Sequence, residues 1–184
     1  MKARVNKVSI QTVLEDILSL PIAAVVVATD VNLSVSPTLA ARAGASVLRD
    51  CSLIGWCEVA SAVITGAGNL PAEKIIHAVG PRWGEGSERG KLANVTVSCL
   101  RLAEQNRLKS IAIPPISTGA LGYPLENCAK TMLTQIIDFT FENLKHLRQI
   151  VICLDSALAL DVFNQEFARQ LQELQTTGEG QVKV

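Results

Sequence analysis

Residues 110–124 have the sequence Ser-Ile-Ala-Ile-Pro-Pro-Ile-Ser-Thr-Gly-Ala-Leu-Gly-Tyr-Pro, an apolar run followed by a loop of small residues. The run at 110–113 is short and closed by two prolines, which is typical of a buried strand. From 125 to 141, apolar residues repeat at helical spacing, which predicts a helix. The loop at 117–122 therefore joins a strand to a helix, the place where open α/β sheets bind ligands.

The rest of the chain extends this alternation of strands and helices. Strands are predicted at 5–14, 22–28, 61–65, 74–79, 110–113 and 149–154, and helices at 36–51, 91–106, 125–141 and 158–174. Alternating elements in the second half predict parallel neighbours, whereas the turn at 66–71 predicts a hairpin. The expected fold class is α/β, with a mixed sheet of six strands.

The composition excludes several classes of protein. Of the 184 residues, 48% are hydrophobic and 18% are charged, so the chain can bury a core and is not disordered. The 17 basic and 17 acidic residues balance, which argues against nucleic acid as a partner. No apolar run is long enough for a membrane span or a signal peptide, so we expect a cytoplasmic protein. We expect a single domain over 1–174 and a flexible tail over 175–184.

The five cysteines and two histidines do not form a metal-binding pattern. No Cys-x-x-Cys pair occurs, so we expect no metal and no cofactor, and we expect the cysteines to be buried free thiols.

The loop at 117–122 has the composition of a phosphate-binding loop. Its residues are Ser117, Thr118, Gly119, Ala120, Leu121 and Gly122. Small residues let backbone N–H groups approach an anion closely, and the helix that follows adds positive potential. The loop lacks the lysine of a P-loop, so it suits a diphosphate that is held rather than transferred. The alternative is a tight strand-to-helix turn without a ligand.

Two carboxylates follow predicted strands at the same rim. Asp16 has the chemistry to accept a hydrogen bond from an exocyclic amine, as on adenine, but it also suits a turn or capping position. Asp30 follows the buried strand at 22–28, where loop solvation is the alternative. His77 lies in an apolar strand, which favours a hydrogen-bonded core residue over a catalytic base. No Ser/His/Asp set is visible, and Ser117 lacks the surroundings of a nucleophile elbow.

These residues together resemble the macrodomain family, the ADP-ribose-recognising α/β/α modules. The resemblance spans about residues 8–171 and is strongest over 70–83 and 111–124. It implies a three-layer α/β/α sandwich with a six-stranded mixed sheet, and ADP-ribose or a related nucleotide as the partner. It also implies that Asp16 and Ile17 lie at the adenine, that 117–122 wraps the diphosphate, that Leu121 lies beside the distal ribose and that Leu154 lies near the adenine.

Two departures from the family pattern affect the distal part of this site. Family members with hydrolase activity commonly have Asn-Ala-Ala-Asn where this chain has Val-Ala-Thr-Asp at 27–30, and Val27 cannot hydrogen-bond a ribose hydroxyl. Such members also have a glycine-rich loop, whereas this chain has Ser34, Val35, Ser36 and Pro37. Pro37 moreover lacks an amide donor. The sequence therefore predicts a non-catalytic or weakly active domain that binds ADP-ribose through Asp16 and 117–122.

Two other functions remain open from the sequence. One is an ADP-ribosyl hydrolase with a divergent site, in which Asp30 orients the attacking water. The other is a vestigial site on a fold retained for protein or RNA interaction. A cleft between 30–37 and 117–122 that is filled by its own side chains would favour the second of these alternatives.

Overall fold

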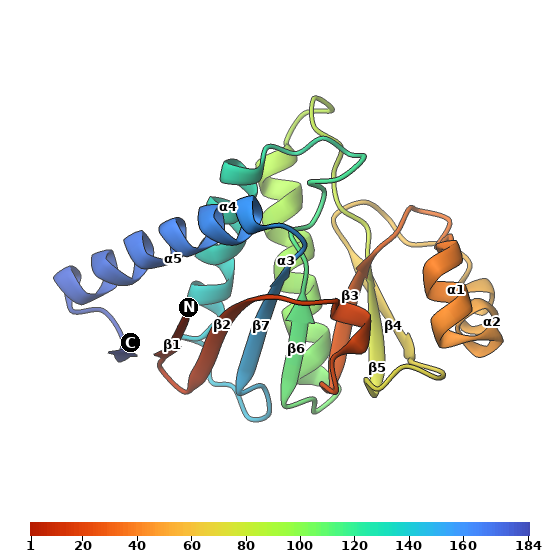
Figure 1. Cartoon of the computed structure of the whole chain (residues 1–184), viewed down its shortest axis with the longest axis horizontal. Helices are drawn as coiled ribbons and strands as arrows, with labels where there is room; N and C mark the ends of the chain where they lie inside the picture. The colour runs from red at the N-terminus through yellow and green to blue at the C-terminus, as the bar shows by residue number, and fades with distance from the viewer.

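A computed structural model describes all residues, 1–184 (Figure 1). The strands are β1 (Lys2–Val5), β2 (Val8–Leu14), β3 (Ala24–Ala28), β4 (Ala62–Gly66), β5 (Lys74–Ala78), β6 (Ser110–Ile113), β7 (Gln149–Leu154) and β8 (Val182–Lys183). The helices are the short 3-10 helix η1 (Ile17–Ser19), α1 (Pro37–Ala43), α2 (Ala45–Ile54), α3 (Glu88–Gln105), α4 (Leu125–Phe139) and α5 (Ala157–Thr177).

All eight strands form one mixed sheet in the order β4-β5-β3-β6-β7-β2-β1-β8. The five central strands from β5 to β2 are parallel to their neighbours, and β4, β1 and β8 pair antiparallel at the edges. The predicted α/β class and the hairpin of β4 with β5 are confirmed. The predicted count of six strands is wrong, because the sheet has eight.

The two additional strands come from a turn and a short edge pairing. Asn6, with a φ of 55°, reverses the chain, so the segment predicted as one strand at 5–14 continues a hairpin of β1 with β2. At the other end, Val182 pairs with Val5 on β1, which brings the chain termini to the same edge of the sheet (Figure 1). The single-domain division and the flexibility of 175–184 stay predictions.

Two cores pack on the two faces of the sheet. The larger contains 34 buried residues and joins the sheet to α3, α4 and α5, while a core of 16 joins it to η1, α1 and α2. Alternate residues of β7 explain the division: Ile150, Ile152 and Leu154 face the larger core, and Val151 and Cys153 face the smaller one. This is the three-layer arrangement that the resemblance implies.

Local signals place the helix that borders the site. The Ser36 side chain accepts a hydrogen bond from the Leu39 amide at 3.2 Å, and Pro37 occupies the first helical position, so α1 begins where the sequence predicts. The helix predicted over 36–51 is interrupted at Gly44, whose φ of 92° is outside the helical region. Helices α1 and α2 are therefore two separate elements.

Candidate functional site

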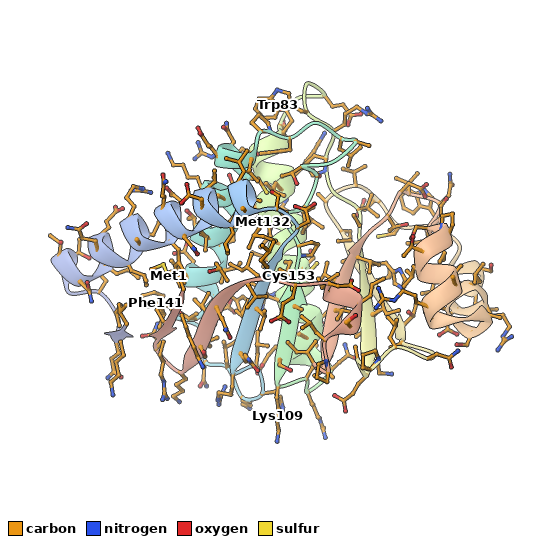
Figure 2. All side chains as sticks on the ribbon, in the orientation of Figure 1. Met1, Trp83, Lys109, Met132, Phe141 and Cys153 are labelled. Carbon is orange, nitrogen blue, oxygen red and sulfur yellow. The ribbon has the colours of Figure 1, made fainter.

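The carboxyl ends of the central strands border an open cavity of about 610 Å³. Figure 2 shows the direction of these strands: Lys109, just before β6, lies at one end of the sheet, and Trp83, in the loop after β5, lies at the other. The cavity is lined by Ala28, Thr29, Asp30, Ser34, Val35, Ser36, Pro37, Gly80, Pro114, Pro115, Ile116, Ser117, Thr118, Gly119, Ala120, Leu121 and Asp155. No Lys or Arg lines this cavity, so an anion in it would be held by backbone amides.

The loop between β6 and α4 presents free backbone amides. The Tyr123 amide donates to the Ser117 carbonyl at 2.9 Å, which closes the loop on itself. The Leu121 carbonyl accepts from the Trp83 amide at 2.9 Å, so the loop is also tied to the segment after β5. The amides of Gly119, Ala120 and Leu121 have no acceptor within the protein. Three donors on a fixed loop are suited to the oxygens of a diphosphate.

Ser117 holds this loop in a constrained position. Its φ is 68°, a left-handed conformation that a serine rarely adopts, and its side chain is 6% exposed with a hydroxyl that lacks a partner. Gly80 lies directly against it: a Cβ at Gly80 would overlap the Ser117 hydroxyl and come within 2.7 Å of the Ile116 Cγ2. Backbone strain and an unpaired buried hydroxyl at a cavity wall are typical of functional sites.

The opposite wall is organised by Asp30. One oxygen of its carboxylate, Oδ1, accepts hydrogen bonds from the Asn32 amide at 3.0 Å and the Ser34 amide at 3.1 Å. These hydrogen bonds hold the pKa of Asp30 below its usual range, and the bond from the Ser34 amide has the largest effect. The amides of Val35 and Ser36 have no acceptor within the protein. The wall therefore offers an ionised, fixed carboxylate and two further free amides.

A second hollow of about 330 Å³ adjoins the cavity and shares five lining residues with it, Ala28, Thr29, Ser34, Ser36 and Pro114. Ile17 and Leu18 of η1, Thr38 and Leu39 of α1 and the buried His77 of β5 also line it. Asp16 stands at the start of η1 and pairs with Arg42 of α1, and it lines neither the cavity nor the adjoining hollow.

The structure brings most of the predicted site residues to these two hollows. Asp30, Ser34, Val35, Ser117, Thr118, Gly119, Ala120 and Leu121 line the cavity, Ile17 and Val27 line the adjoining hollow, and Gly122 lines neither. Leu154 is 1% exposed and belongs to the larger core, because it continues the inward alternation of β7. The next residue, Asp155, lines the cavity although it is absent from the predicted set. The end of a strand at this edge of the sheet was the available signal for it.

His77 is a buried core residue, as the sequence predicts. It is 1% exposed, and its Nε2 lies 2.8 Å from the Thr65 hydroxyl. Since that hydroxyl also donates to the Gly66 carbonyl at 2.9 Å, Nε2 carries the proton and donates to Thr65. Burial lowers the pKa of His77 to about 4, against an opposing effect of the Asp50 charge. The ring is therefore neutral in the folded protein at neutral pH.

We expect His77 to make the folded protein acid-sensitive. The unfolded chain, in which a histidine has a pKa of about 6.5, binds this proton more readily than the folded protein. His77 therefore does not lower the free energy of unfolding above about pH 6.5. As the pH falls from there toward 4, the free energy of unfolding decreases by up to about 1.4 kcal/mol per pH unit. Urea unfolding between pH 4 and 7 measures this slope. His77→Leu should flatten it and the half-buried His146→Gln should not; equal slopes in all three proteins would contradict the assignment.

The five cysteines are free and buried, as predicted. No three His, Cys, Asp or Glu side chains come together as a metal site would require. None of the helices has the length and apolar character needed to cross a membrane.

Comparison with known proteins identifies the fold family. Residues 29–132 match the Macro domain, more than half of the chain. This chain belongs to the Macro domain family. An O-acetyl-ADP-ribose deacetylase of Salmonella gallinarum is 37% identical to it over 160 residues, which cover 82% of this macrodomain and 89% of the enzyme. An uncharacterized protein of Sulfurisphaera tokodaii is 47% identical over 109 residues, which cover 59% of this chain and 58% of that protein.

Solved macrodomains agree with this assignment. The Oceanobacillus iheyensis macrodomain with ADP superposes with a TM-score of 0.89 at 26% identity, covering 94% of this chain and 97% of that one. A mutant of the same protein with ADP-ribose gives a TM-score of 0.88 at 27% identity, covering 94% and 98%. The nucleotides in these structures belong to the Oceanobacillus protein.

These relatives correct one prediction. The sequence predicted a non-catalytic or weakly active domain, because Val27 and Ser34–Pro37 replace family residues. That prediction is wrong: relatives that align with 82% of this chain are O-acetyl-ADP-ribose deacetylases. The structure gives a physical reason, since the replaced loop keeps free amides at Val35 and Ser36 and a fixed carboxylate at Asp30.

Proposed function

We propose that this macrodomain is an esterase for acylated ADP-ribose, which converts O-acetyl-ADP-ribose and water to ADP-ribose and acetate. The observation that carries the proposal is the open cavity, which joins the free amides of the loop at 117–121 to the fixed carboxylate of Asp30. The deacetylases among its relatives support the same chemistry.

In this proposal, the amides hold the nucleotide. Hydrogen bonds from Gly119, Ala120 and Leu121 to diphosphate oxygens contribute about 1.5–3 kcal/mol each, as charge-assisted bonds do. Val35 and Ser36 supply donors from the opposite wall. Because no cation lines the cavity, the diphosphate depends on these amides, and the geometry of the loop at 117–121 controls affinity.

Asp30 then acts as the general base. Its Oδ1 is occupied by two amides, so Oδ2 is the oxygen that accepts a proton from water. The water oxygen attacks the acyl carbon, the bond from that carbon to the ribose oxygen breaks, and the ribose oxygen takes up the proton. Asp155 lines the same cavity, but no hydrogen bond within the protein fixes its carboxylate.

The open cavity speaks against a vestigial site. A vestigial cleft filled by its own side chains was the alternative, and here about 610 Å³ remains open. Leu33 is buried and Val27 is half-buried, so these two residues do not form an exposed apolar patch for a partner. The exposed apolar side chains in this region, such as Leu53 and Trp56, come from the end of α2 and the segment after it.

The test is direct turnover of the substrate. We expect purified protein at neutral pH to release ADP-ribose and acetate in equal amounts from O-acetyl-ADP-ribose, measured by chromatography. Calorimetric titration with ADP-ribose should give one site per chain. A second assay with a protein that carries ADP-ribose on glutamate distinguishes an ADP-ribosyl hydrolase from a deacetylase. Folded protein that releases no acetate above the buffer rate would refute the proposal.

A further inference from the structure

A groove of about 550 Å³ lies outside the cavity, between the start of α3 and α4. Its lining includes Trp83, Arg89, Tyr123, Lys130 and Thr131, and none of these residues lines the cavity or the adjoining hollow. A volume of this size is typical of small-molecule sites in proteins. The groove is therefore a second candidate site, separate from the cavity beside Asp30.

The groove differs from the cavity in its charge. Arg89 of α3 and Lys130 of α4 are exposed, and neither forms an ion pair within the protein. Glu88 is the one carboxylate in the lining, and its Oε1 already accepts hydrogen bonds from two amides of the preceding loop, at 2.8 and 3.1 Å. The groove thus has a net positive charge, whereas no Lys or Arg lines the cavity. An anion is therefore attracted to the groove by side-chain charge.

Two buried hydroxyls add a hydrogen-bond donor to the groove. Tyr123 and Thr131 are 3% and 9% exposed, and both line the groove. Their hydroxyls lie beside each other, and neither has a partner elsewhere in the protein. Burial raises the pKa of Tyr123, so its hydroxyl keeps the proton at neutral pH. When one of the two hydroxyls donates to the other, one O–H of the pair stays free to donate to a ligand.

Trp83 supplies an aromatic ring to the groove, at the carboxyl end of the sheet (Figure 2). The residue is 45% exposed, and its ring packs edge-to-face against Tyr123, with 5.0 Å between the ring centroids and 66° between the ring planes. Its amide donates to the Leu121 carbonyl at 2.9 Å. Ring and backbone are thus fixed before a ligand arrives, which reduces the entropy that binding costs. A fixed and exposed indole is suited to stack on a planar base.

We propose that this groove is a second binding site, which takes a nucleoside monophosphate with its base on Trp83 and its phosphate between Arg89 and Lys130. A guanidinium pairs with two phosphate oxygens, and an ammonium adds a compact charge. The free O–H of the Tyr123 and Thr131 pair donates to a further oxygen. A nucleoside without phosphate uses only the indole, and inorganic phosphate uses only the cations and the hydroxyls, so each of them occupies half of the site.

Trp83 fluorescence measures binding at this groove. The chain has two tryptophans, so Trp56→Phe leaves Trp83 as the only indole. ADP-ribose at a saturating concentration keeps the added nucleotide out of the cavity. We expect AMP to quench the fluorescence with a Kd of about 0.1–1 mM, whereas adenosine and inorganic phosphate should each bind at least about tenfold more weakly.

Substitution of the two cations assigns the site. In the Trp56→Phe protein, Arg89→Gln and Lys130→Gln should each weaken AMP about tenfold and leave adenosine unchanged. Arg49→Gln and Lys145→Gln are the matched controls, because both residues are exposed and lie outside the groove, and they should keep the affinity.

The proposal is overturned if AMP up to about 10 mM causes no saturable quenching, or if both groove variants bind AMP as the unchanged protein does. The groove does not depend on the proposed function, since none of the side chains named for it lines the cavity. If ADP-ribose itself does not bind, the deacetylase proposal fails, and the effect of Arg89→Gln on AMP still decides the assignment of the groove.

Discussion

Replacing Asp30 by asparagine should lower kcat for O-acetyl-ADP-ribose by about 10²–10⁴-fold, the range that a general base contributes. The asparagine oxygen can still accept the amides of Asn32 and Ser34, so the loop should keep its conformation. KM should therefore change little, because the amides at 117–121 that hold the nucleotide are untouched. Steady-state kinetics measures the two constants separately.

The pH profile adds an independent readout for Asp30. Its pKa is held below the usual range, so the base form persists down to pH values below the ordinary aspartate pKa of about 3.9. Protonation of Asp30 should therefore not lower kcat above pH 5. It should lower kcat only in more acidic solutions. A pH-rate profile must be limited to conditions in which the protein remains folded, since His77 weakens the fold below about pH 6.5.

Three further variants make the Asp30 assignment decisive. Asp30→Ala removes the acceptor for both amides, so it should lower kcat and also raise KM by loosening the wall. Asp161→Asn changes a carboxylate on α5 that contacts Gln165 outside the cavity, and it should leave both constants unchanged. Asp155→Asn should have a small effect. If Asp155→Asn abolishes turnover while Asp30→Asn does not, the base is Asp155.

The elements that the sequence predicts well carry strong local signals. The limits of β7 and the start of α1 at Ser36-Pro37 agree with the prediction, because a bounded apolar run and an N-cap are local features. The errors concern tertiary features. The hairpin turn at Asn6-Lys7 lacks glycine and proline, and the two-residue strand β8 exists only because β1 lies beside it.

One wall of the candidate site can be predicted from the sequence, because a run of small residues indicates a loop whose backbone amides are accessible. The loop at 117–121 lies in the cavity because a strand ends before it, which local sequence shows. The prediction of a non-catalytic domain is wrong because it rests on the side chains at 27 and 34–37, whereas the loop binds through its backbone. Free amides at Val35 and Ser36 depend on the path of the backbone, which the loss of glycines does not determine. The close approach of Gly80 to Ser117 joins two segments that are distant in the sequence, so no local sequence pattern predicts it.

Gly80→Ala should destabilise the protein by about 1–3 kcal/mol and lower turnover by about 10²-fold. The new methyl group overlaps the Ser117 hydroxyl and lies 2.7 Å from the Ile116 Cγ2, both in buried positions, so the backbone of the loop must move. A displacement of the free amides at 119–121 then weakens the hold on the diphosphate. Thermal unfolding and the deacetylation assay measure the two effects on the same preparation.

Two comparisons separate a local overlap from a general effect of alanine. Gly90 of α3 has nothing within 4 Å of the added Cβ, so Gly90→Ala should stabilise the protein by about 0.5–1 kcal/mol and keep turnover. Ser117→Gly removes the overlapping hydroxyl and suits the φ of 68°, so combining it with Gly80→Ala should recover part of the lost stability. The Ile116 contact remains in the double variant, which limits the recovery. If Ser117→Gly recovers no stability, the overlap with Ile116, and not that with Ser117, causes the loss.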